Sequence, residues 1–318
     1  MTASALAPVA IFAFNRPEKL QRLIDSLRAC ELSEDSHFIF FIDGPRHSRE
    51  ISVVKQVVEI AESSNLNSFE VQASDVNRGL RKSIYNGVRA VVNKYGTAIV
   101  LEDDLILSSI ALRYFNEGLS HYVDNETVWS ICGYVWNAQE LSNHPRAVVL
   151  PLTNSWGWAT WKRAWDQFDL DARPDELHLK SRSFKTLFDI DGLYLFTGMM
   201  EMSIGKLISS WYVHWNYVVF RNRGVSIFPP QRVVDNTGLG AGTHGGSLNP
   251  YRLLVRAPPS LLEKMPIFPT GGDVDYWAID ALRTCWELRV TRFIATVGAI
   301  RRKLFRGVIP LKNNRGFE

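Results

Sequence analysis

The segment from Ala98 to Leu105 places a run of apolar residues directly before three consecutive carboxylates, Glu102–Asp104. Such an apolar run is typical of a strand that is buried on both faces of a sheet. Adjacent like charges repel, and Mg2+ or Mn2+ commonly offsets that repulsion at oxygen-rich sites. In open α/β sheets, ligands bind at the carboxyl ends of strands. The segment therefore favours a metal site at a sheet edge that holds a phosphorylated ligand, with a solvated acidic turn as the alternative.

The first 125 or so residues alternate between strand-like and helix-like patterns. This alternation predicts an α/β fold with a Rossmann-like, mostly parallel sheet flanked by helices. The sequence contains neither a GxGxxG fingerprint nor a Walker A motif, so the three acids and their metal would have to hold the phosphates. The expected strands here are Val9–Ala13, Phe38–Ile42, Phe69–Ala73 and 97–101. Helices are expected after Asn15-Arg16-Pro17, at 51–60, at 80–93 and, after the acids, in a segment that includes Leu112.

Composition excludes several classes of protein. The chain has 318 residues, 46% of them hydrophobic, which is enough for one large domain or two smaller ones. A net charge of +3 is too small to indicate nucleic-acid binding. The three cysteines lie far apart and form no CxxC pair, which fits a reducing compartment. No apolar stretch is long enough to span a membrane, so we expect a cytoplasmic protein.

The C-terminal residues follow a different pattern. From Ile279 to Leu304 apolar residues recur every three or four positions, and seven lysines and arginines lie between 283 and 306. This pattern predicts a long, basic amphipathic helix. Two interpretations stay open, because such a helix either packs on the protein or mediates dimerisation, or binds the anionic inner face of the plasma membrane.

With these motifs in view, the chain resembles GT-A glycosyltransferases, and more narrowly the bacterial relatives of N-acetylglucosaminyltransferase I. The resemblance covers about residues 7 to 250. It is carried by the segments 9–17, 41–44, 99–105, 155–161 and 211–215, which look like the opening strand, the acidic turn, the metal motif and the two acceptor-side elements.

The resemblance implies a metal-dependent, inverting transfer of a sugar from a nucleotide diphosphosugar, by default UDP-linked, to a glycan or lipid-linked acceptor. It places this activity in surface polysaccharide synthesis, and the C-terminal amphipathic pattern, which lies outside the resemblance, suggests a peripheral position on the membrane. Residues 1–125 would form the donor half of one domain, residues 126–255 the acceptor half, and residues 256–318 a helical extension.

The resemblance and the local patterns together assign site residues. The predicted metal ligands are Asp104 and His244, with Mn2+ or Mg2+ as cofactor. The predicted donor-binding residues are Asn15, Arg16, Asp43, Arg78, Arg81, Glu102 and Asp103, and the predicted acceptor-side residues are Trp156, Trp158, Trp211 and Tyr212.

The catalytic base is the least constrained assignment. Tyr212 occupies the place of the family's catalytic Asp, and a tyrosine of ordinary pKa is a poor base at pH 7. Glu201 and His214 are therefore the predicted bases, and Asp235 is a further candidate. The departure at Tyr212 keeps a second hypothesis open, a catalytically inactive relative that binds a sugar or nucleotide. A nucleotidyltransferase is disfavoured because no glycine-rich, basic loop follows the first strand.

Overall fold

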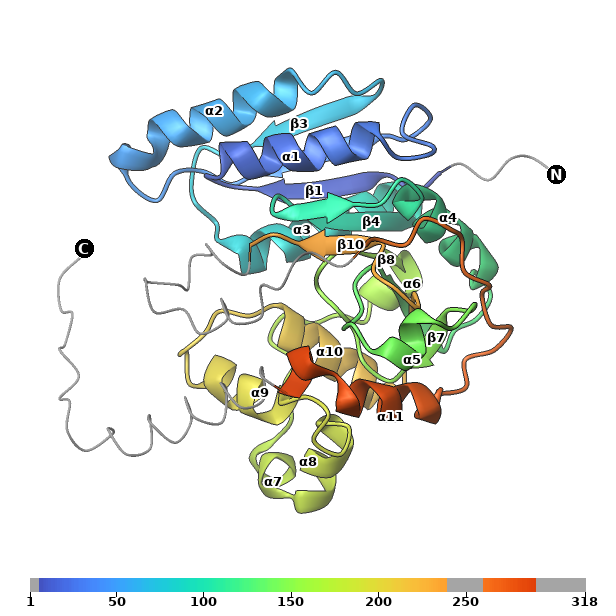
Figure 1. The fold of residues 1–318 in the computed structure, drawn as a ribbon. Helices are drawn as coiled ribbons and strands as arrows, with labels where there is room; N and C mark the ends of the chain where they lie inside the picture. Colours follow the sequence, from blue (N-terminus) through green and yellow to red (C-terminus); the bar gives the residue numbers. More distant parts are fainter. Residues whose placement is uncertain (1–5, 239–259, 290–318) are drawn as a thin grey trace.

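The computed structural model describes residues 6–238 and 260–289. Within them, eight strands form one sheet in the order β3-β2-β1-β4-β8-β6-β9-β7 (Figure 1). Only β8 and β7 run against the others, which confirms the predicted mostly parallel sheet. The strands are β1 (Val9–Ala13), β2 (Phe38–Ile42), β3 (Phe69–Ala73), β4 (Thr97–Glu102), β6 (Val128–Cys132), β7 (Val148–Leu150), β8 (Trp158–Trp161) and β9 (Val225–Phe228).

Helices cover both faces of the sheet, and strand β1 shows why. Val9 and Ile11 face one hydrophobic core with α1, α2 and α4, whereas Ala10 and Phe12 face a second core with α3, α6 and α10. The helices are α1 (Pro17–Arg28), α2 (Ile51–Glu62), α3 (Leu80–Tyr95), α4 (Ala111–His121), α5 (Gln139–Ser142), α6 (Lys162–Trp165), α7 (Glu176–Lys180), α8 (Arg182–Phe188), α9 (Phe196–Ile204), α10 (Tyr212–Arg221) and α11 (Tyr276–Thr284), with a 3-10 turn η1 (Ser48–Glu50).

The parallel strands bring the predicted site to one edge. Strands β1, β2 and β4 are adjacent and parallel, so the residues that follow their carboxyl ends lie side by side. The chain turns from β1 into α1 at Arg16, where Pro17 takes the first helical position and fixes the backbone for helix entry. The strand order reverses here, because the chain runs outward from β1 to β2 and β3 whereas β4 lies on the other side of β1. This makes the edge the switch point where α/β folds bind ligands.

A small second sheet closes this edge. Strand β5 (Leu105–Leu107), directly after the acids, pairs in antiparallel fashion with β10 (Val234–Asn236). The pairing carries the residue after β10 back to the acids, where the amide and hydroxyl of Thr237 both donate to the backbone oxygen of Asp104, at 2.9 and 2.8 Å.

The C-terminal helix differs from the prediction. Helix α11 ends at Thr284, and Cys285 has extended backbone angles (φ −62°, ψ 123°). Residues 286–289 are helical again, so the predicted continuous helix from Ile279 is interrupted at Cys285, and its part beyond residue 289 lies outside the described residues. Within the described part of the chain, no helix combines the length and apolar character needed to cross a membrane.

Candidate active site

Arg16 holds two of the three acids. Its guanidinium forms a two-pronged ion pair with Asp103 through Nε and Nη2, and its Nη1 donates to Asp104 Oδ2 at 2.8 Å. The side chain of Asp103 is only 1% exposed, so its charge depends on this partner. Arg16, predicted to address a diphosphate, here pairs with Asp103 and Asp104.

The acids repel one another in a buried setting. Burial raises the pKa of Asp103 to about 6, against the lowering effect of Arg16. Burial, with the negative charges of Asp104 and Asp103, raises the pKa of Glu102 to about 8. Burial also opposes the charge on Arg16, but its carboxylate neighbours outweigh this effect and raise the Arg16 pKa. The edge therefore has three carboxyl groups and one arginine paired with two of them.

Asp104 has a carboxylate that is more exposed than that of Asp103. Its side chain is 13% exposed and its Oδ1 accepts no hydrogen bond from a described residue, whereas Oδ2 is held by Arg16. Gly238 lies against it: a Cβ at this glycine would fall 2.1 Å from Asp104 Oδ2 and 2.9 Å from Asn236 Oδ1. The absence of a side chain at position 238 thus keeps the carboxylate in place.

Replacing Gly238 with Ala is therefore expected to push the Asp104 carboxylate from its position. We expect Mn2+-dependent binding of a nucleoside diphosphate to weaken by about tenfold, measured by calorimetry, because a displaced ligand loses the geometry that binding needs. The matched control is Gly198→Ala, where a Cβ meets no atom within 4 Å. Equal affinity of Gly238→Ala and the wild-type chain would contradict this role for the glycine.

Asp43 organises a loop instead of facing a ligand. The buried carboxylate accepts four hydrogen bonds, from the amides of Gly44, Arg78 and Gly79 and from the side chain of Asn77. These four donors occupy both oxygens, so the predicted contact with a nucleotide base would have to displace one of them. The structure gives Asp43 the function of fixing the turn that enters α3.

The remaining predicted donor-side residues lie around this edge with different partners. Asn15 donates to Glu50 at 3.1 Å. Arg81 is tied to the loop after α6, donating to Leu170 O at 2.6 Å and to Asp171 at 2.9 Å. Arg78 is exposed and contributes its backbone amide to Asp43. Predicted metal ligand His244 lies outside the described residues.

Most of the predicted acceptor-side aromatic residues belong to the core. Trp158 is 1% exposed and stacks on Trp211, with ring centroids 5.5 Å apart. Tyr212 is buried and its hydroxyl donates to Thr153 O at 2.7 Å. Trp156 is partly exposed and packs edge-on against Tyr134. Trp156 is thus the member of this set with surface available to a ligand.

The Tyr212 hydroxyl is a structural donor, and burial raises its pKa well above the ordinary value. Tyr212→Phe is therefore expected to lower the free energy of unfolding by about 1 kcal/mol, the usual value of one lost hydrogen bond. Urea denaturation measures this loss, and donor binding should stay unchanged. A loss of donor binding without a loss of stability would contradict the structural assignment.

The two predicted bases, His214 and Glu201, both form contacts with other side chains or with the backbone. His214 is buried, its ring nitrogens lie 2.7 Å from Ala172 O and 2.8 Å from Ser203 Oγ, and burial lowers its pKa. Neutral imidazole satisfies both contacts, as in a structural histidine. Glu201 lies on α9, on the side of the molecule away from α1 in Figure 1, and pairs with Lys185 at 3.8 Å. Neither is brought to Glu102–Asp104 by a described contact.

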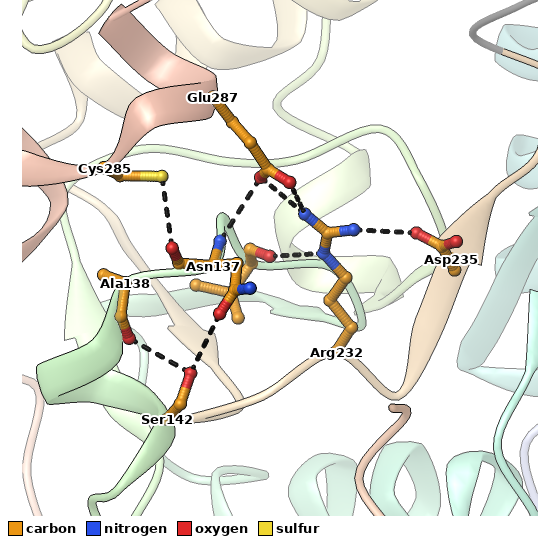
Figure 2. A network of polar contacts seen from close by, with 8 residues as sticks. Asn137, Ala138, Ser142, Arg232, Asp235, Cys285 and Glu287 are labelled. Atoms are coloured by element: carbon orange, nitrogen blue, oxygen red, sulfur yellow. Dashed lines mark hydrogen bonds and ion pairs between the residues drawn. The ribbon is translucent and has the colours of Figure 1, made fainter. Parts of the chain in front are cut away.

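A buried arginine network ties the chain beyond α11 to this edge, and the sequence patterns did not indicate it (Figure 2). Arg232, 7% exposed, donates to Asp235 on β10 at 2.9 Å, to Val135 O at 3.0 Å and to both oxygens of Glu287. Its guanidinium also lies 4.3 Å from the centre of the Tyr134 ring. Asp235, a further candidate base in the sequence, is thereby engaged in an ion pair.

The acids fit a loosely held divalent cation. Within the described residues, no group of three His, Cys, Asp or Glu side chains is arranged to enclose a metal. Mg2+ and Mn2+ need no such enclosure, since they keep waters and substrate phosphates beside one or two carboxylates. Asp104, whose Oδ1 accepts no hydrogen bond from a described residue and whose side chain is 13% exposed, fits such a ligand.

Comparison with known proteins yields partial structural likenesses. No family model matches the chain, and no curated protein matches it. The mannosyltransferase PcManGT from Pyrobaculum calidifontis, solved with GDP-Man and Mn2+, superposes on 69% of this chain and 69% of its own, at 8% identity and a TM-score of 0.38. S. aureus TarS superposes on 60% of this chain and 33% of its own, at 13% identity and a TM-score of 0.37. At these scores the likeness does not indicate which reaction or substrate this chain uses.

Proposed function

We propose that this protein is a metal-dependent glycosyltransferase that takes a sugar from a nucleotide diphosphosugar. The observation that carries the proposal is the set of three acids at the carboxyl end of β4, at the switch point of a mostly parallel sheet, with Asp104 partly exposed and Arg16 paired with Asp103 and Asp104. This edge suits a ligand whose phosphates need a cation, because the sheet offers carboxylates there and no glycine-rich cradle.

In this proposal Asp104 holds Mn2+ or Mg2+, and Glu102, whose pKa is raised to about 8, lies beside it at the end of β4. When bound, the cation stabilises the negative charge that grows on the leaving diphosphate as the glycosidic bond breaks. The chain's own residues prepare this site: Arg16 keeps Asp103 ionised and fixes Asp104, and the Thr237 amide and hydroxyl hold the backbone of the acidic turn. A UDP-linked donor, an inverted product and a glycan or lipid-linked acceptor remain parts of the proposal, as do the halves 1–125 and 126–255.

Calorimetric titration of the full chain tests this proposal. UDP, GDP, CDP, ADP and dTDP are titrated with Mn2+ and again with excess chelator. We expect one of these nucleotides to bind at micromolar Kd with Mn2+ and at least about tenfold more weakly without it. If none of them binds in either condition, the proposed function is wrong.

A second function is favoured by the buried state of Tyr212. The residue that takes the place of the family's catalytic Asp donates its hydroxyl to Thr153 O inside the core, where it cannot reach an acceptor. A protein that binds the donor without transferring its sugar fits this contact. Incubation with the nucleotide sugar separates the two functions, because an enzyme releases the nucleoside diphosphate over time and a binding protein does not.

A further inference from the structure

The edge that carries the acids also carries a cation that forms no ion pair with a described residue. Lys19 lies in the first turn of α1, and its Nζ is enclosed by protein without a hydrogen-bond partner among the described residues. The charges that act on it most are those of Arg16, Asp104, Asp103 and Arg22. Lys19 is therefore within electrostatic range of the acids while forming no salt bridge with a described residue.

Arg16 is committed elsewhere, and this gives the lysine its importance. Nε, Nη1 and Nη2 of Arg16 each donate to a carboxylate of Asp103 or Asp104. A guanidinium held in this way stabilises the acids. If it turned toward a ligand, the buried Asp103 carboxylate would lose its counter-charge, which is unfavourable. An anionic ligand at this edge needs a different cation.

The position of Lys19 follows from the packing of α1. The helix lies against β5, the strand that continues from Asp104. Its Ser26 Oγ accepts a hydrogen bond from the backbone amide of Leu107 at 3.2 Å. The apolar residues Leu20 and Leu23 bury the inner face of the helix, and Lys19, directly before Leu20, is partly exposed. Its terminal ammonium is a compact charge on a flexible stem, a form that binds phosphate oxygens well.

A buried ammonium without a partner is unfavourable unless a ligand completes it. We propose that Lys19 binds the diphosphate of the nucleotide donor at the same edge as Asp104. The inference rests on the proposed function, because it assigns a second contact to the same ligand. It transfers to Lys19 the contact that the sequence patterns assigned to Arg16.

The test compares Lys19→Met and Lys19→Arg in the full chain. The nucleoside diphosphate that binds the wild-type chain best is titrated with Mn2+, and its nucleoside without phosphate is titrated in parallel. We expect Lys19→Met to raise the Kd of the diphosphate about tenfold and to leave the Kd of the nucleoside within about twofold, because one charge-assisted contact to phosphate is lost. Lys19→Arg should restore most of the affinity.

Arg22→Met is the matched control, since Arg22 lies on the same helix one turn farther on and is exposed. It should bind the diphosphate as the wild-type chain does. Thermal denaturation accompanies each titration, and Lys19→Met should melt at the same temperature as the wild-type chain or higher, because an unpaired buried charge is removed. A lower affinity in a variant of undiminished stability then reports on the ligand contact.

The outcomes separate the two proposals. If the wild-type chain binds a diphosphate and Lys19→Met binds it within twofold, the role of Lys19 is wrong and the proposed function stands. If Lys19→Met weakens nucleoside and diphosphate equally, the lysine supports the site's structure and the inference is also wrong. If the wild-type chain binds no nucleoside diphosphate, the proposed function is wrong and the assignment of Lys19 is wrong with it.

Discussion

Replacing Asp104 with Asn is expected to weaken Mn2+-dependent binding of the nucleoside diphosphate by about a hundredfold or more and to stop sugar transfer. The amide keeps the shape of the carboxylate, and its oxygen still accepts the Arg16 hydrogen bond at the place of Oδ2. What the variant loses is the charge that holds the cation, and Lewis-acid stabilisation by such a cation contributes several kcal/mol, or roughly a hundredfold or more. Calorimetry with and without Mn2+ measures the loss.

The fold of this variant should be unimpaired. Asp104 adds to the repulsion that acts on buried Glu102 and Asp103, so removing its charge should leave the melting temperature equal or higher. Asp25→Asn is the matched control, because Asp25 is an exposed aspartate of α1 that pairs with Arg28. It should bind the nucleotide as the wild-type chain does. Full Mn2+-dependent affinity in Asp104→Asn would show that Asp104 does not hold the metal.

Local patterns were sufficient to predict the elements that position the acids. The bounds of Val9–Ala13 and Phe38–Ile42 agree with the observed strands because each is an uninterrupted apolar run that ends at a polar turn. Arg16 was predicted to address a diphosphate, and its contacts with Asp103 and Asp104 were not predicted. The contact with Asp103 joins residues that are 87 positions apart in the sequence. A local sequence pattern does not show whether an arginine will pair with a protein carboxylate or with the phosphate of a ligand.

The second half of the chain was harder to predict for physical reasons. Tryptophans at positions 158 and 211 suit an acceptor wall and a packed core equally well, and burial decides between the two. The pairing of β5 with β10 joins short strands far apart in the sequence, so neither has a periodicity of its own. The break at Cys285 is invisible to periodicity, because the apolar spacing of four from Leu282 to Trp286 continues across it.

Replacing Arg232 with Met is expected to lower the free energy of unfolding by about 3 kcal/mol. The guanidinium is 7% exposed and bridges Asp235, which is 17% exposed, to Glu287, which is 23% exposed (Figure 2). Without it the two carboxylates face each other in a partly buried space, and Val135 O loses its donor. Removal of one partner from a buried ion pair typically costs 3–5 kcal/mol, and the partial exposure of the carboxylates places this case at about the lower limit.

Urea denaturation of the full chain measures this loss, and three further variants identify its cause. Arg232→Lys should recover only part of the stability, because a single ammonium cannot reach three acceptors as the planar fork does. Glu287→Gln should be milder than Arg232→Met, since its amide oxygen still accepts from the arginine. Arg113→Met removes an exposed arginine that pairs with Glu117 and should change stability by less than about 0.5 kcal/mol.

The network also has a consequence for the site, because Asp235 lies on β10 and β10 pairs with the strand that follows the acids. If Arg232 anchors this strand, the amide protons of β10 should exchange faster with solvent in Arg232→Met than in Arg113→Met, at a temperature where both variants are folded. A stability loss below about 1 kcal/mol, with unchanged exchange at β10, would contradict the anchoring role. A large loss with faster exchange would show that the chain beyond α11 stabilises the edge on which Asp104 lies.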